Sequence, residues 1–269
     1  MKHSMRLLFL LVSSLGTLTT LAEASATQPT PRTPPPGFSA LWNGRDLAGW
    51  WGAGTEDPRA YMALPPADLQ AKRAASLADI QQHWSVRDGE LVNDGKGLFL
   101  TTEQSYGDFE LLVDYKTVPL ADSGIYLRGC PQVQIWDSTE QAKFAIGADK
   151  GSGGLWNNSP GAPGKDPLAK ADKPFGQWNH FRILMAGTRV WVWLNDQPTV
   201  SGAVLENYYD RKLPVPARGP IQLQTHGGEI CWRNGFIRDI GSDEADRLTR
   251  APRDGQVPVK VQAEGVRKH

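Results

Sequence analysis

The segment at residues 121–137, ADSGIYLRGCPQVQIWD, contains two runs of alternating apolar and polar side chains, at 123–128 and 132–136. Turn residues at 129–131 separate the runs, so the pattern predicts a β-hairpin. Successive side chains of a strand point to opposite faces. One face of the hairpin would therefore point toward a core with its apolar residues, Ile125, Leu127, Val133 and Ile135. The opposite face would carry Tyr126, Arg128, Gln132, Gln134 and Trp136, with Asp122 and Asp137 at the open end of the hairpin. Charge, amides and aromatic rings make this second face poor as core and suitable as a platform for a polar ligand.

Short runs of strand-forming residues, separated by turn residues, follow along most of the chain. They lie at 38–41, 84–86, 90–92, 98–102, 109–116, 178–185, 190–194, 198–200, 221–224 and 230–240. Asp88-Gly89 is the strongest short hairpin signal among the connecting turns. The main body has no sustained 3.6-residue period, so the pattern predicts an all-β domain of two packed antiparallel sheets.

Three segments depart from this strand pattern. Residues 55–82 are rich in Ala, Lys, Arg, Gln and Asp, and Ser76 followed by Asp79 fits a helix N-cap, so we expect a short helical insertion near residues 65–82. The insertion would be either a wall beside a groove or surface decoration. Residues 138–176 form a long loop rich in Gly and Pro, and such loops are usually functional or disordered. The tail at 243–269 is charged and poor in large apolar residues, so we expect disorder or a loosely packed arm.

The first 26 residues have the features of a secretory signal peptide. Basic residues precede an apolar run from 7 to about 21, and alanines at 24 and 26 stand at the A-x-A cleavage spacing. The alternative, an uncleaved N-terminal anchor, is weakened because the run is shorter than the ~20 residues of a spanning helix. Residues 27–36, TQPTPRTPPP, predict an extended proline-rich linker. We therefore expect a domain at 37–242 that is secreted or periplasmic and has no membrane association after signal cleavage.

Charge and cysteine content exclude some functions. The chain has 29 basic and 29 acidic side chains among 269 residues, a formal net charge of zero. No net field draws it toward nucleic acid or an anionic membrane, and it contains no nucleic-acid motif. Cys130 and Cys231 are the only cysteines, and in an exported protein they either pair or remain as partly buried thiols. Their spacing matches no metal-binding motif.

The hairpin sequence ADSGIYLRG, followed by QVQIWD, resembles the centre of the 3-keto-disaccharide hydrolase domain family. Further pieces similar to that family follow in the same order: GFSALWNGRDLAGW at 37–50, HWSVRDGELV at 83–92, GDFELLVDYK at 107–116, GQWNHFRI at 176–183, and GPIQLQTHGGEICWRNGFIRDI at 219–240. The resemblance implies a concanavalin A-like, jelly-roll sandwich that binds sugar on the concave face of one sheet. The family motif has Asn where this chain has Asp122, and Glu where it has Gln132.

The resemblance also implies cleavage of 3-keto-glycosides such as 3-keto-disaccharides, so the expected partner is a small carbohydrate. A ketone at C3 acidifies the neighbouring C2–H, so a base can remove that proton while the C1 substituent leaves. Addition of water then makes the net reaction a hydrolysis. Such a reaction needs a base near C2, an electrophile at the C3 oxygen and an acid for the leaving oxygen.

Four residues are candidates for this chemistry. Asp137 is the first candidate for the base and His226 the second, since an imidazole titrates near neutral pH. Arg128 is the candidate to stabilise the enolate oxygen, and Asp122 would hold Arg128 or act as a second acid. The expected substrate-binding residues are Gln132, Gln134, Tyr126, Trp136, Trp156, Asn157 and Gln224.

Several alternatives stay open. Asp137 fits a turn cap, Arg128 an ion pair between strands, and His226 a loop residue bonded to backbone. The sequence requires no cofactor. Carboxylate and imidazole groups suit a divalent metal, however, so Asp122, Asp137 and His226 could hold one. The spacing of these three residues matches no established ligand pattern. Two other functions compete with the lyase or hydrolase: a non-catalytic glycan-binding module, favoured by Gln132 in place of Glu, and a glycosidase that uses Asp122 and Asp137 as its two carboxylates.

Overall fold

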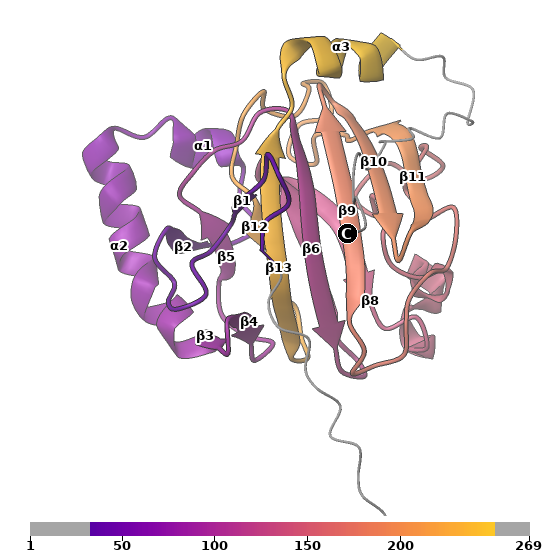
Figure 1. Cartoon of the computed structure of the whole chain (residues 1–269), viewed down its shortest axis with the longest axis horizontal. Helices are drawn as coiled ribbons and strands as arrows, with labels where there is room; N and C mark the ends of the chain where they lie inside the picture. Colours follow the sequence, from indigo (N-terminus) through magenta and orange to yellow (C-terminus); the bar gives the residue numbers. More distant parts are fainter. Residues whose placement is uncertain (1–32, 251–269) are drawn as a thin grey trace, which may run out of the picture. The chain divides into compact units, whose positions relative to one another are not determined.

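The structure is a computed structural model, and it describes residues 33–250. Two antiparallel β-sheets pack against each other (Figure 1). The predicted signal peptide at 1–26, the predicted linker up to residue 32 and the predicted tail from residue 251 lie outside the described residues. Within 33–250 no helix is both long and apolar enough to cross a membrane.

The larger sheet has eight strands. Its order is β11 (Gln197–Val204), β10 (Arg189–Leu194), β9 (Asn179–Ala186), β6 (Phe109–Thr117), β13 (Ile230–Asp239), β4 (Glu90–Asn93) and β3 (Trp84–Arg87), and β1 (Ser39–Ala40) pairs with β13. In Figure 1 the long strands β13, β6 and β9 run side by side through its middle. Each of these strands was expected from its residue pattern, and the shared register places them as one layer.

The smaller sheet has five strands and contains the predicted hairpin. Its order is β2 (Trp50–Ala53), β5 (Phe99–Thr102), β12 (Gln222–Leu223), β7 (Asp122–Leu127) and β8 (Cys130–Trp136). The turn of the hairpin differs from the expectation at 129–131, because it consists of Arg128 and Gly129, with φ of 53° and 75°. Two successive positive φ values are the mark of a two-residue type I′ turn. Arg128 is therefore a turn residue, outside the alternation of β7.

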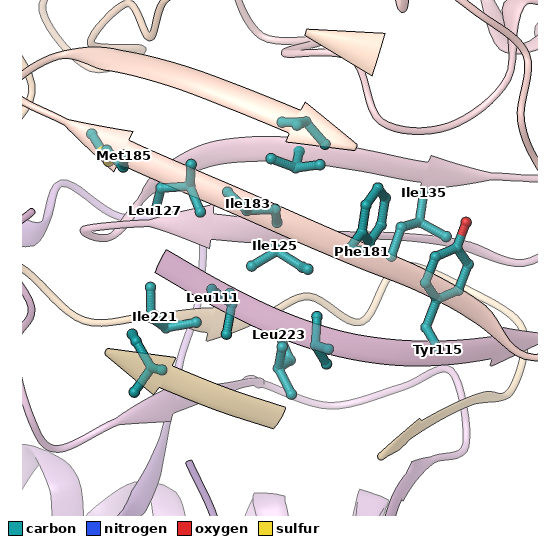
Figure 2. Packing of buried hydrophobic residues seen from close by; sticks show 14 of the residues in the cluster. Leu111, Tyr115, Ile125, Leu127, Ile135, Phe181, Ile183, Met185, Ile221 and Leu223 are labelled. Atoms are coloured by element: carbon teal, nitrogen blue, oxygen red, sulfur yellow. The ribbon is translucent and has the colours of Figure 1, made fainter. Parts of the chain in front are cut away.

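The core lies between the sheets. Figure 2 shows Ile125, Leu127 and Ile135 of the smaller sheet in one cluster with Leu111 and Ile183 of the larger sheet. Because these residues of β7 and β8 point inward, the side chains that alternate with them point away from the core. The structure confirms the predicted all-β sandwich of two antiparallel sheets.

The helical insertion is also confirmed, as α1 (Pro58–Met62) and α2 (Pro66–His83). The predicted cap at Ser76 is wrong, because α2 already begins at Pro66, a residue type suited to the first helical position. Ser76 lies inside the helix, where its hydroxyl donates to the carbonyl of Arg73 at 2.7 Å and accepts from the N–H of Gly52 at 2.8 Å. The side chain that suggested a helix start instead joins α2 to β2.

Two further differences concern the long loop and the tail. The loop at 138–176 contains two 3-10 helices, η1 (Gln141–Ile146) and η2 (Ala148–Lys150). The expectation of disorder beyond 242 is wrong for α3 (Ser242–Arg250), which buries Ala245 against Leu184 of β9. Glu244 also accepts from the guanidinium of Arg238 at 2.7 and 2.9 Å. Two apolar residues, Ala245 and Leu248, and the ion pair of Glu244 thus dock this charged helix.

Cys130 and Cys231 do not pair. Both are free and buried. Burial raises the pKa of the Cys130 thiol to about 12, and it raises the pKa of Cys231 as well. The alternative of two buried thiols therefore holds.

Candidate functional site

Polar side chains gather on the face of the five-stranded sheet that points away from the core. They come from β7, β8 and the adjoining β12, and each is less than one tenth exposed: Asp122, Gln132, Gln134, Gln222 and Gln224. The alternation of β7 and β8 places them there, since Ile125, Val133 and Ile135 occupy the core side. The predicted polar face therefore exists, and it is a largely covered one.

Asp122 is the centre of this face. Its Oδ1 accepts from Gln134 Nε2 at 2.9 Å, while Lys143 Nζ lies 3.1 Å and His226 Nδ1 3.2 Å from its Oδ2. Lys143 also pairs with Glu140 at 3.0 Å. We call Asp122, Gln134, Glu140, Lys143 and His226 the Asp122 cluster. The sequence predicted three of these residues as site residues, and the structure brings those three together.

His226 is the most accessible member of the Asp122 cluster, with 65% of its side chain exposed. The ring nitrogen of His226 nearest to this carboxylate is Nδ1, 3.2 Å from Asp122 Oδ2, and a carboxylate favours a proton on the nitrogen that faces it. The lone pair is then on Nε2, which can accept a proton. His226 thus has the arrangement of a general base oriented by a carboxylate.

Lys143 was missed by the sequence analysis. Burial lowers its pKa, but hydrogen bonds to Glu140 and Asp122 outweigh that effect and raise the pKa, so its ammonium group stays charged. The residue lies in η1, within the loop at 138–176. The available signal was the pair Glu140 and Lys143, three residues apart just after a strand, a spacing that brings side chains together on a helical turn.

The amide of Gln134 has a fixed orientation. Its Nε2 donates to Asp122 Oδ1 and to the carbonyls of Ser123 and Ile135, at 2.9, 3.2 and 3.0 Å. All three partners are acceptors, so Gln134 Oε1 must face the other way, where it accepts from Gln132 Nε2. Gln132 Oε1 is then left as a buried acceptor with no hydrogen-bond partner among residues 33–250.

The same argument fixes the orientation of the Gln222 side-chain amide. Its Nε2 donates to the hydroxyl of Thr101 at 3.0 Å, and that hydroxyl in turn donates to the carbonyl of Phe99 at 3.1 Å. Gln222 Oε1 is therefore a second buried acceptor without a partner in the described part of the chain, and Gln224 Oε1 is a third. Buried polar groups in native proteins are nearly always paired, so three such oxygens on one face indicate a place where donor groups of a ligand or of water bind.

Arg128 does not belong to this face, and its predicted role at an enolate oxygen is wrong. Its guanidinium donates to the carbonyls of Gly107, Gly187 and Pro216 at 2.8, 2.9 and 3.2 Å, and to Asp108 Oδ1 at 2.6 Å. These partners lie in loops that flank β6 and β9 or precede β12. The type I′ turn takes Arg128 out of β7, so the side chain ties the hairpin to the opposite sheet.

Asp137, the first candidate for the base, is a cap. Its carboxylate accepts from the N–H of Leu120 at 2.9 Å and from the N–H and hydroxyl of Thr139 at 2.7 and 2.6 Å. Burial raises the pKa of Asp137, but these hydrogen bonds outweigh it and hold the pKa below its usual value. A carboxylate stabilised in this way is a poor base.

The predicted metal ligands are not assembled as a set. Asp122 and His226 adjoin each other, whereas the oxygens of Asp137 face Leu120 and Thr139. Over residues 33–250 no three His, Cys, Asp or Glu side chains are grouped so that they could hold a metal ion.

Aromatic side chains border the polar face. The rings of Trp136 and Trp156 meet edge to face with centroids 5.9 Å apart, and Trp156 is the more exposed of the two. Tyr126 is buried against Phe99, and its hydroxyl lies 3.3 Å from that of Thr55. Asn157 follows Trp156, and its Oδ1 is buried without a hydrogen-bond partner among residues 33–250. Their roles as substrate contacts stay predictions.

The comparisons with known proteins agree with the fold. A family profile described as a 3-keto-alpha-glucoside-1,2-lyase-like domain matches residues 37–238. No match was found among curated proteins.

Solved structures of two proteins from Parabacteroides distasonis, each described provisionally as a glycosyl hydrolase, are similar to this chain. One has 23% identity and a TM-score of 0.54 and covers 81% of this chain and 95% of its own. The other has 21% identity and a TM-score of 0.50 and covers 76% and 94%. At such identity the likeness shows the fold alone.

Proposed function

Because the chain belongs to the family of 3-keto-alpha-glucoside-1,2-lyase-like domains, we propose that it is an exported enzyme that cleaves 3-keto-glycosides, including 3-keto-disaccharides. The reaction would proceed by removal of the C2 proton, elimination of the C1 substituent and hydration. One observation carries the proposal: the imidazole of His226 and the ammonium group of Lys143 both lie beside Asp122 Oδ2. The family match covers the whole β-sandwich and supports this substrate class.

His226 is the base in this proposal, in place of Asp137. Asp122 Oδ2 faces its Nδ1 at 3.2 Å, so Nε2 is the atom that takes the C2 proton. Lys143 replaces Arg128 as the electrophile. Its Nζ and His226 Nδ1 lie 3.1 and 3.2 Å from the same oxygen and hence within about 6 Å of each other. The imidazole and the ammonium group therefore lie beside the same carboxylate, and in this proposal they act on the C2 proton and the C3 oxygen.

The buried amide oxygens supply the binding part. Gln132, Gln222 and Gln224 present acceptors without partners, and sugar hydroxyl groups are donors. A ketone oxygen cannot donate, so the C3 carbonyl is best placed at the ammonium of Lys143 and away from the glutamines. This arrangement distinguishes an oxidised from an unoxidised sugar at C3.

The atoms of the proposed reaction balance. His226 takes the C2 proton, and the electron pair of that bond moves to the C3 oxygen, which Lys143 stabilises as an enolate. The pair then returns to form the C1–C2 double bond as the bond from C1 to the leaving oxygen breaks, and the imidazolium protonates that oxygen. Water adds to C1 and a proton to C2, so the net result is hydrolysis.

The test is to incubate the purified protein with a 3-keto-disaccharide and follow release of 3-keto-glucose, with solvent deuterium uptake at C2 as a second readout. His226→Gln should lower kcat by about 10²–10⁴-fold, as expected for loss of a general base. Lys143→Gln should lower it by about 10²–10³-fold, as for loss of one oxyanion partner.

Lys150→Gln is the matched control for Lys143, because Lys150 lies close by in η2 and pairs only with Asp166 at the surface. It should leave kcat unchanged. Absence of both product release and deuterium uptake in the folded wild-type protein would reject the enzyme proposal for this substrate class.

A second candidate is a glycan-binding module without turnover, and the amide at Gln132 favours it. Gln132 cannot transfer a proton, and its fixed orientation makes it a pure acceptor toward a ligand. Calorimetry with the 3-keto-disaccharide and with its unoxidised parent separates the two functions. A binder would show affinity for either sugar with no bond cleavage.

A further inference from the structure

A cleft lies at the β2 end of the smaller sheet. Its volume is about 190 Å³, and its lining includes Trp51, Tyr61, Leu69, Arg73, Glu103 and Ser105. Trp51 comes from β2, while Tyr61, Leu69 and Arg73 come from α1 and α2. No residue of the Asp122 cluster lines this cleft, so it is a separate feature of the molecule.

The lining carries polar hydrogens without acceptors. Trp51 and Tyr61 are 1% and 3% exposed, and neither Trp51 Nε1 nor the Tyr61 hydroxyl has a hydrogen-bond partner among residues 33–250. Arg73 Nε is likewise buried and unpartnered, although Arg73 Nη2 donates to the carbonyl of Glu103 at 3.0 Å. All three residues line the cleft, and each has a buried donor without a partner in the described part of the chain, so the lining is short of acceptor oxygens.

The size of the cleft limits the ligand. Pockets for drug-sized ligands span roughly 300–1,000 Å³. A cavity of about 150 Å³ holds a single benzene ring. At about 190 Å³ the cleft suits one six-membered ring with its substituents rather than a longer chain.

Charge and surface indicate the chemistry of the ligand. Arg73 and Glu103 give the lining one cation and one carboxylate, which favours a neutral molecule with both donors and acceptors. The rings of Trp51 and Tyr61 meet edge to face at 5.3 Å, and Leu69 packs against them, so the wall is apolar between its polar groups. Apolar ring faces and hydroxyl groups together are the features of a sugar.

We propose that this cleft binds one neutral hexose unit, as a second saccharide site apart from the Asp122 cluster. The helical insertion at 58–83 then has a function, since α1 and α2 build the outer wall of the site. Arg73 is its central donor: the residue lines the cleft, its guanidinium carbon lies 5.8 Å from the centre of the Trp51 ring, and its Nε has no partner among residues 33–250.

The test is an NMR titration of the full chain that follows the indole N–H resonance of Trp51, assigned with a Trp51→Phe variant. Glucose should shift this resonance in a saturable way. Glucuronate, which has the same ring and an added carboxylate, should bind no more tightly than glucose, because Arg73 and Glu103 balance the charge of the lining. The glucose response should persist unchanged in Asp122→Asn.

Arg73→Gln should raise the apparent Kd for glucose at least tenfold. Lys72→Gln is the matched control, because Lys72 is the preceding residue of α2 and pairs with Glu56 outside the cleft. Its Kd should stay within twofold of wild type. Tyr61→Phe, which removes only the hydroxyl, should also weaken binding. No saturable shift, equal affinity in Arg73→Gln, or a preference for glucuronate would each overturn the proposal.

Discussion

Arg128 shows how one backbone torsion decides the function of a side chain. Its φ of 53° makes it the first residue of the turn, and its guanidinium then meets four acceptors in loops outside the hairpin. Burial lowers the pKa of Arg128 while Asp108 raises it, and burial dominates. A buried cation with this many partners is a structural tether, which a simple alternation of side chains cannot reveal.

We predict that Arg128→Met destabilises the fold by about 3 kcal/mol or more, because it leaves the carbonyl partners and Asp108 without their donor. Urea denaturation measures this change. Arg218→Met is the control, since Arg218 is exposed and donates to one carbonyl, that of Ser105, and its cost should stay within about 0.5–1 kcal/mol. A large loss of kcat in Arg128→Met molecules that remain folded would contradict the structural role.

Asp137 gives the stability a defined pH dependence. Its pKa in the folded chain lies below the ordinary value of about 4, so its stabilising effect is complete above that pH. The effect is lost as the pH falls through the folded-state pKa. The difference in unfolding free energy between wild type and Asp137→Asn, measured by denaturation at a series of pH values, should therefore shrink as the pH falls below about 4.

The same experiment contains its own check. If the difference between the two proteins stayed constant down to pH about 2, Asp137 would not be the capping carboxylate that the hydrogen bonds of Thr139 and Leu120 indicate.

At this scale the sequence predicted part of the site. Asp122, Gln134 and His226 were all candidates, because strand alternation and motif position identify them without knowledge of side-chain contacts. Lys143 was missed, because its spacing from Glu140 marks only a local pair, and its place beside Asp122 depends on how η1 folds back onto β7. The roles of Asp137 and Arg128 could not be separated from their structural alternatives, because both depend on hydrogen bonds to distant backbone.

At the scale of elements, β7 and β8 are fitted to each other through Gly124. A Cβ at this position would lie 2.9 Å from Gln132 Cδ and 3.0 Å from the carbonyl oxygen of Val133. The backbone oxygen cannot move without disturbing the strand, so the Gln132 amide must shift. The glycine therefore makes room for the amide that Gln134 orients.

We predict that Gly124→Ala destabilises the fold by about 1–3 kcal/mol through overpacking and raises KM for the 3-keto-disaccharide more than it lowers kcat. Thermal denaturation and steady-state kinetics measure the two effects. Gly54→Ala is the control, because a Cβ at Gly54 would meet no atom within 4 Å. An unchanged KM in Gly124→Ala would show that the position of Gln132 is not part of binding.

Elements with a regular pattern were predictable, and those held by tertiary contacts were not. The long strands β6, β9 and β13 and the insertion helix follow from periodicity and composition. The short strand β2 was missed, because it is defined by its register with β5 rather than by alternation. Helix α3 was missed because its polar sequence becomes ordered through Ala245 and Arg238.

At the scale of the whole molecule, the two free cysteines report on global opening. Cys130 and Cys231 lie in different sheets, and burial raises the pKa of each thiol. Since the thiolate is the reactive form, both should be inert toward an aromatic disulfide reagent in the native protein. In denaturant the reagent should detect the two thiols that the sequence contains.

The rate of thiol labelling at intermediate denaturant should follow the rate of global unfolding measured by fluorescence. Rapid reaction of Cys130 in native buffer would contradict the buried environment next to the hairpin turn. The fluorescence of the ten tryptophans reports unfolding in parallel, because several of them lie in the core.

The two-layer architecture was predictable, because the number of strands and the spacing of turns are enough to indicate it. The covering of the polar face by other parts of the chain was not predictable. The sequence suggested an open platform, yet Gln132, Gln134 and Gln222 are almost fully buried. Alternation tells which side of a sheet a residue faces. It cannot tell which distant loops cover that side.

The flanks of the smaller sheet have a further consequence. At the β2 edge, the N–H of Trp50 donates to the Leu47 carbonyl and the N–H of Gly52 donates to the Ser76 hydroxyl. At the β8 edge, Gln134 exchanges backbone hydrogen bonds with residues 153–154. Another molecule therefore finds no open ladder there on which to add a strand. Concentrated solutions of this protein should resist fibril growth through that sheet, even though its interior is rich in β-branched and aromatic residues.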